Sequence, residues 1–152
     1  MSIRETKLRL RRRLGATLVF AVAAISSQIT GGDDAQAASG GPIWSRRFGD
    51  ADMQLGWSVA VDGAENVLLT GSLWGTADFG GGPLASAGSD DIFVAKFDSG
   101  GNHLWSKRHG EAGSQYGQSV AMDGAGNALL TGSFGGTADF GGGPLPSAGL
   151  SD

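Results

Sequence analysis

Residues 70–88 read TGSLWGTADFGGGPLASAG, and residues 131–149 repeat them 61 positions later as TGSFGGTADFGGGPLPSAG. The same offset aligns residues 43–91 with residues 104–152 without a gap, and 33 of those 49 positions are identical. A constant spacing over so many positions indicates one structural unit used twice. The sequence therefore predicts a tandem repeat whose second unit is truncated.

Glycine supplies 28 of the 152 residues, but without the three-residue period of collagen. The glycines fall at equivalent places in the two units, which favours turns and tight sheet packing over disorder. Good helix formers are sparse after residue 40, and apolar residues alternate with polar ones in short runs. These features predict an all-β fold.

Each 61-residue unit is expected to form four antiparallel strands. Asp-Gly and Asn between the runs supply the positive-φ positions that tight hairpins need. The Gly-rich stretch at residues 74–88 is expected to be a long excursion at the end of the sheet. The expected strands are residues 43–48, 57–61, 67–73 and 92–97 in the first unit, and residues 104–109, 118–122 and 128–134 in the second.

A four-stranded sheet with two apolar faces is not stable alone and must stack on further copies. Radial stacking produces a propeller of about 4–8 blades. The chain supplies one complete sheet, one strand of a preceding blade and half of a following blade. We therefore expect an incomplete β-propeller-like array, which cannot close a ring and exposes sheet faces and edges.

Several separated motifs occur in a fixed order across residues 43–152. They include DIFVAKFD at residues 91–98, GN at 101–102, LWS at 104–106, LTGSF at 130–134 and DFG at 139–141. Together they resemble the bacterial SBBP β-propeller repeat. The resemblance implies a secreted or cell-surface protein built of many tandem repeats. This chain has fewer than two copies, and Glu65 stands where a turn glycine is usual.

The N-terminal region has the three parts of a secretory signal peptide. Residues 1–13 are basic, residues 14–25 form an apolar run, and Ala35-Gln36-Ala37 offers small residues for cleavage after Ala37. We expect residues 1–37 to be a signal-peptide helix and residues 38–42 a short linker. The apolar run is shorter than a membrane span of about 20 residues. Either the general secretory route or, through Arg11-Arg12-Arg13, the twin-arginine route fits.

The formal net charge of the whole chain is −4. Residues 1–37 hold six basic and three acidic residues, so residues 38–152 hold 11 − 6 = 5 basic and 15 − 3 = 12 acidic residues, a net charge of −7. Such an acidic segment argues against a nucleic-acid partner. The chain has no cysteine, which excludes disulfides and thiolate metal sites.

Three aspartate pairs recur in register and are candidate calcium ligands. Their spacing differs from a calcium-binding loop, and aspartate in a hairpin turn ordinarily accepts hydrogen bonds from its own backbone. We therefore expect turn capping and no cofactor, with calcium as the alternative. His103 and His109 have no histidine counterparts in the other unit, so we expect no zinc site. The aspartate pairs are Asp62/Asp123, Asp78/Asp139 and Asp91/Asp152.

No catalytic residues are expected. The chain has no G-x-S-x-G motif, and Gly80-Gly81-Gly82 lacks the Lys-Ser/Thr that follows a phosphate-binding loop. Trp44 and Trp105 recur and are expected to pack between neighbouring sheets. Trp57, Trp74 and Tyr116 break the repeat near strand ends or loops. They are the candidate ligand-stacking aromatics, with packing beneath a loop as the alternative.

The sequence therefore predicts an exported repeat protein that is not an enzyme. Its expected role is a non-catalytic scaffold or binding module in the periplasm, at the cell surface or outside the cell. The alternatives are a fragment of a propeller enzyme that acts on polysaccharide and a calcium-dependent adhesion module. We expect a protein or carbohydrate ligand, no membrane span after signal cleavage, and self-association through the unpaired repeats. The expected domains are 1–37, 38–42, 43–103 and 104–152.

Overall fold

The computed structural model describes residues 44–149 and residue 152. This part of the chain is all-β and antiparallel, without a helix, as the sequence predicted. The expected signal-peptide helix at residues 1–37 and the linker at residues 38–42 lie outside the described residues. Within residues 44–149, no helix is long and apolar enough to cross a membrane.

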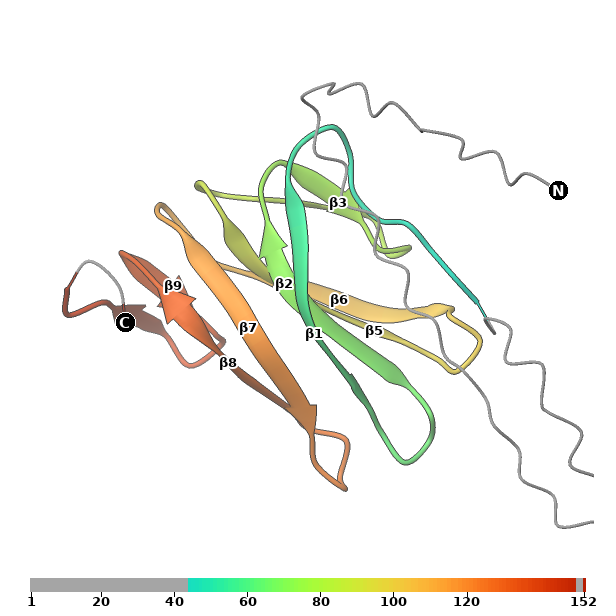
Figure 1. The fold of residues 1–152 in the computed structure, drawn as a ribbon. Helices are drawn as coiled ribbons and strands as arrows, with labels where there is room; N and C mark the ends of the chain where they lie inside the picture. Colours follow the sequence, from blue (N-terminus) through green and yellow to red (C-terminus); the bar gives the residue numbers. More distant parts are fainter. Residues whose placement is uncertain (1–43, 150–151) are drawn as a thin grey trace, which may run out of the picture.

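Four strands form the central sheet in the order β1-β2-β5-β6, which Figure 1 shows in the middle of the molecule. The strands are β1 (Gln54–Val61), β2 (Val67–Leu73), β5 (Asp91–Phe97) and β6 (His103–His109). Because β6 starts the second repeat unit, this sheet crosses the boundary between the sequence repeats. It is the one complete sheet that the sequence predicted.

The second unit contains a separate two-stranded sheet, in which β7 (Gln115–Met122) pairs with β8 (Ala128–Phe134). Both β1 and β7 carry a β-bulge at the same place in the repeat, between Gly56 and Ser58 and between Gly117 and Ser119. Each strand therefore begins three residues before the start predicted from the apolar pattern. The bulge shifts the alternation of side chains, which hides the first part of the strand from a period-two pattern.

The Gly-rich stretch, predicted as a long excursion at the end of the sheet, contains a short two-stranded hairpin in each unit. The turn is held by Asp78 Oδ1, which accepts hydrogen bonds from the Gly80 and Gly82 backbone N–H groups at 2.7 and 3.1 Å. Gly80 and Gly82 have φ of 111° and 104°, which favours glycine. The hairpins are β3 (Thr76–Asp78) with β4 (Pro83–Ala85), and β9 (Thr137–Asp139) with β10 (Pro144–Pro146).

Residues 44–48 do not form the strand that the sequence predicted. The equivalent strand β6 is hydrogen-bonded to β5, whereas residues 44–48 have no neighbouring strand in the described part of the chain, and a β-strand is defined by its ladder of hydrogen bonds to a neighbour. Their side chains nevertheless pack as in the second unit. The Phe48 and Phe79 rings lie 5.2 Å apart, and the equivalent His109 and Phe140 rings lie 5.3 Å apart.

The central sheet is buried on two faces by two separate hydrophobic clusters. We call the face with Leu69, Phe93 and Phe97 the front face; residues 44–48 and the β3–β4 hairpin cover it. The opposite, back face carries Leu68, Ile92 and Val94, and strands β7 and β8 cover it. In Figure 1, β7 and β8 accordingly lie on one side of the sheet and β3 on the other.

The two units stack front to back. Val120, Met122 and Leu130 of the second unit pack on the back face of the first unit, together with Trp105 of β6. By the 61-residue offset, these three residues are the equivalents of Val59, Val61 and Leu69, respectively, on the front face of the first unit. The contact between units is therefore made by the front face of one unit and the back face of the unit before it.

Candidate functional site

The turn aspartates accept hydrogen bonds from their own turns. Asp62 Oδ1 accepts hydrogen bonds from the Ala64 and Asn66 backbone N–H groups at 2.9 and 2.8 Å, and Asp62 Oδ2 accepts one from Asn66 Nδ2 at 2.9 Å. Asp98 and Asp123 repeat this arrangement within the sequences DSGGN and DGAGN. The predicted turn-capping role of aspartate is confirmed at these turns.

The hydrogen bonds lower the pKa of all three turn carboxyls. For Asp62, the Asn66 side chain is the largest cause, and Lys96 Nζ, 3.0 Å from Asp62 Oδ2, adds to it. For Asp98 and Asp123, the Asn102 and Asn127 side chains are the largest causes of the lowered pKa. These carboxylates are thus charged at neutral pH and already occupied by donors of the protein.

Asp91 is the buried member of the acidic residues. Its side chain is inaccessible to solvent, and Arg108 Nη1 forms an ion pair with its Oδ2 while also donating to the Gly110 carbonyl at 2.7 Å. The Ala87 backbone N–H donates to the same Oδ2 at 2.7 Å. The guanidinium of Arg108 thus offsets the charge of the buried Asp91 carboxylate. No group of three or more metal-ligating side chains occurs within residues 44–149 and 152.

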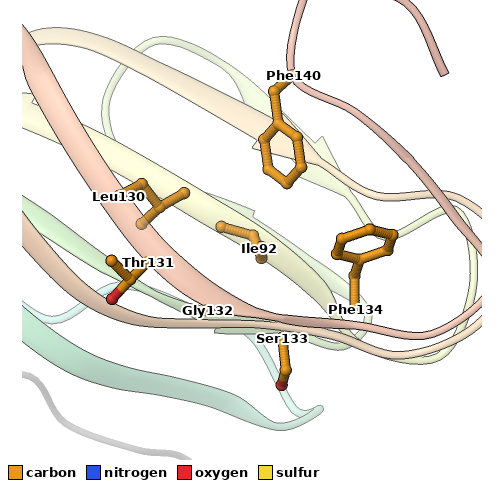
Figure 2. A pocket seen from close by; sticks show the side chains of 7 residues that line it. All are labelled: Ile92, Leu130, Thr131, Gly132, Ser133, Phe134 and Phe140. Carbon is orange, nitrogen blue, oxygen red and sulfur yellow. The ribbon is translucent and has the colours of Figure 1, made fainter. Parts of the chain in front are cut away.

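An apolar groove runs along the free edge of β8, with a cavity of about 400 Å³. Figure 2 shows Leu130, Ile92, Phe134 and Phe140 gathered around this hollow, while the hydroxyl groups of Thr131 and Ser133 point away from it. A second hollow of about 240 Å³ adjoins it. Its lining includes Val94, Trp105, Lys107, His109 and Phe140.

The groove marks the position that β5 fills in the first unit. There, Phe93 is fully buried and stacks on Phe79, with ring centroids 4.8 Å apart. The equivalent of Phe79 is Phe140, which is 40% exposed, compared with 2% for Phe79. Phe140 contacts the rings of His109 and Phe134, but no strand equivalent to β5 lies beside β8 in the described residues, so the counterpart of the Phe79–Phe93 stack is not formed there.

Asp152 is the equivalent of Asp91, the first residue of β5, and it lies beside β8 as Asp91 lies beside β2. Its backbone exchanges two hydrogen bonds with Phe134, at 2.8 and 2.9 Å, as Asp91 pairs with Leu73 in the first unit. Its side chain accepts a hydrogen bond from Ala148 N, as that of Asp91 does from Ala87 N. The edge of β8 therefore has the geometry that accepts an antiparallel strand with apolar side chains.

The three candidate aromatics lie apart on separate segments. Trp57 sits at the bulge of β1 and is 53% exposed, and Trp74 follows β2 and is 50% exposed. Tyr116, on β7, is half-buried, and its hydroxyl lies 3.3 Å from Asp90 Oδ2. No ring contact joins them among the described aromatic residues. Their assignment as ligand-stacking residues stays a prediction.

Of the two recurring tryptophans, Trp105 packs between neighbouring sheets as the sequence predicted, whereas Trp44 packs on the front face of the central sheet. Trp105 packs between the back face and the second unit. Trp44 lies against Phe97, with ring centroids 6.1 Å apart, and its Nε1 donates to the Ser99 carbonyl at 3.0 Å.

Sequence reasoning did not identify the residues of the groove. Leu130 and Phe134 belong to a strand whose equivalent is fully buried, and Ile92 belongs to the other unit. The available signal was the repeat itself. Aligning the units shows that residues 104–152 contain no counterpart of β5, and among the described strands β8 pairs only with β7.

No protein-family model matches the sequence. The chain is similar to an uncharacterized WD repeat-containing protein from Acanthamoeba polyphaga mimivirus, with 24% identity over 110 residues. The match covers 60% of this chain and 8% of that much longer protein. WD repeats are four-stranded propeller blades, so this distant similarity indicates a β-propeller-type repeat. The narrower resemblance to the SBBP repeat stays a prediction.

Proposed function

We propose that the protein is an exported β-propeller-type repeat module that acts as a non-catalytic scaffold or binding module in the periplasm or at the cell surface. The observation that carries this proposal is the front-to-back packing of the two units. Val120 of the second unit is buried against Leu68 and Val94 of the first. A unit that buries its faces on copies of itself is suited to building a surface by repetition.

Ligand binding is assigned to the outer surface of the array. Trp57 and Trp74 each expose about half of their surface, and an exposed indole offers a flat apolar face for a sugar ring or a protein side chain. The groove along β8 offers a second, apolar binding surface. It is lined by apolar side chains and a backbone edge, which suits recognition of an extended strand rather than a reaction.

Export is tested by expressing the full chain in a bacterial host and separating the cytoplasm, periplasm, cell surface and medium. We expect the protein outside the cytoplasm, with an N-terminus that starts at Ala38 after cleavage behind Ala37. An Ala35→Asp, Ala37→Asp variant is expected to stay uncleaved, because cleavage requires small residues at both positions. Wild-type protein that remains in the cytoplasm with an intact Met1 would overturn the proposal.

Binding is tested with the exported protein and an array of oligosaccharides and bacterial surface proteins. Quenching of tryptophan fluorescence on binding, reduced in Trp57→Ala or Trp74→Ala, is the expected result. Hydrolysis of an oligosaccharide by the pure protein would instead identify an enzyme. A calcium-induced rise in melting temperature would identify the adhesion module, since calcium has to bind the native state to stabilise it.

A further inference from the structure

The two ends of the stack expose complementary surfaces. On β1, Val59 and Val61 of the front face are 52% and 61% exposed. On the opposite end, Leu129 of β8 is 54% exposed, on the back face of the second unit. We call the β1 residues the front strip and the outer face of β7–β8 the back surface.

Both surfaces are copies of surfaces that already meet inside the chain. The equivalents of Val59 and Val61 are Val120 and Met122, which pack on the back face of the first unit. The equivalent of Leu129 is Leu68, which is fully buried in that contact. The front strip therefore corresponds to the surface of the second unit that packs on the first. The back surface corresponds to the back face of the first unit, on which the second unit packs.

From this equivalence, and building on the proposed role as a repeat scaffold, we propose that a second copy of the chain packs its front strip on the back surface of the first. The contact repeats the one between the two units of a single chain. It is heterologous, because each copy contributes a different surface, and such contacts generate rings or open filaments.

The sequence preserves the polar details of the contact. Inside the chain, the Val120 backbone N–H donates a hydrogen bond across the units to Ser58 Oγ, at 3.2 Å. The equivalent pair between copies is the Val59 N–H and Ser119 Oγ, and both positions again lie beside a β-bulge. Val59 and Ser119 are identical to their equivalents, so this hydrogen bond is retained between copies.

The acceptor retains the equivalents of β1 and β2, whereas residues 104–152 contain no equivalent of Ile92 or Val94 of β5, which belong to the apolar cluster of the internal contact. Within the chain, β7 contacts β1 and β2 much more extensively than β5. The equivalents of β1 and β2 in the second unit are β7 and β8, which are both present. Trp57 stays free in the assembly, because its equivalent Gln118 is exposed beside the internal contact.

The test uses two single variants of the full chain, one for each surface. Val59→Asp places a charge on the front strip, and Leu129→Asp places one on the back surface. Both positions are about half exposed, so the fold of the monomer should be unaffected, as circular dichroism would verify. Leu145→Asp on the β9–β10 hairpin, where Leu145 is 52% exposed, is the matched control outside both surfaces.

Sedimentation equilibrium measures the result. Wild type and Leu145→Asp are expected to increase in mass with concentration, whereas each single variant stays monomeric. An equimolar mixture of Val59→Asp and Leu129→Asp is expected to form a 1:1 dimer and no larger species, because one intact front strip meets one intact back surface. Should either variant unfold, Val61→Asp and Ala121→Asp replace them.

Three results would overturn the inference. They are a monomeric wild type at millimolar concentration, a mixture that stays monomeric while wild type associates, and a loss of association in Leu145→Asp. The second would point to another surface, such as the edge of β8. None of the three bears on export or on ligand binding by Trp57 and Trp74, so the proposed function would be judged separately.

Discussion

Strands β2 and β8 carry nearly the same sequence, VLLTGSL and ALLTGSF, in opposite environments. Every residue of β2 is buried, because β1 and β5 flank it and both faces of the sheet are covered. Strand β8 has β7 on one side, the groove on the other and an uncovered back surface, and none of its residues is buried. Burial in this protein is therefore set by position in the array rather than by sequence, which makes the two units natural controls for each other.

The largest difference in the free energy of unfolding is expected between Leu68→Ala and Leu129→Ala, which change equivalent positions. Leu68 is fully buried, so its truncation leaves a cavity and should cost about 2–5 kcal/mol of unfolding free energy. Leu129 is 54% exposed, and the same change should stay within about 0.5 kcal/mol. Urea denaturation at concentrations where the protein is monomeric measures both values. Equal costs would mean that the second unit is covered in solution.

A smaller difference in the free energy of unfolding is expected between Arg108→Ala and Arg47→Ala, which change equivalent positions. Removing Arg108 leaves the buried Asp91 carboxylate without its ion-pair partner and should cost about 2 kcal/mol. Arg47 is exposed, so its removal should have little effect. Chemical denaturation of the two variants is the measurement, and a cost for Arg47→Ala as large as for Arg108→Ala would break the comparison.

At the equivalent turn positions 65 and 126, exchanging a side chain for glycine or the reverse should change the free energy of unfolding by about 1 kcal/mol, with opposite signs at the two positions. Glu65 adopts φ of 63°, whereas its equivalent Gly126 has φ of 84°, and a side chain in this left-handed region is strained. Glu65→Gly should therefore raise the melting temperature by about 5 °C, and Gly126→Ala should lower it by a similar amount. Thermal melts followed by circular dichroism test this. A lower melting temperature for Glu65→Gly would show that Glu65 stabilises the fold by another interaction.

The smallest contrast concerns acid stability. Asp62 and Asp123 both have a lowered pKa in the folded protein, from an ordinary value of 3.8. Each carboxylate contributes stability that is fully present above pH 3.8 and is lost as the pH falls through the lower folded pKa. Because Asp62 also pairs with Lys96, Asp62→Asn should reduce the acid sensitivity more than Asp123→Asn. Melting temperatures at pH 7 and pH 2.5 compare the variants, and an unchanged acid response in Asp62→Asn would contradict the assignment.

The repeat offset and the apolar runs predicted most of the fold. The third expected strand, residues 67–73, coincides with β2, and β5 and β6 begin one residue before their predictions. The β3–β4 hairpin was missed because three-residue strands among glycines carry no readable alternation. Residues 43–48 were predicted as a strand because apolar and polar positions alternate in them, but pairing depends on a neighbour that a local pattern does not contain.

The groove shows the same limit for the candidate site. It brings Ile92 of the first unit together with Phe140 of the second, and no local motif relates these two residues. The aromatics singled out by sequence are exposed at Trp57 and Trp74, as a binding role requires. Residues that break the repeat, such as Trp57 and Trp74, can be recognised in the sequence. Residues such as Leu130 match their equivalents in the other unit and differ only in the strands that surround them, which the sequence does not show locally.

Strand β6 completes the first sheet although it opens the second repeat unit, so the sequence period and the sheet boundary are out of phase. Because the 61-residue offset holds without a gap, a duplication or deletion of 61 residues adds or removes one whole sheet wherever its breakpoints fall. Every such junction joins strands that are equivalent to those it replaces. Unequal recombination within the gene can therefore change the length of the array in single steps without creating a misfolded junction.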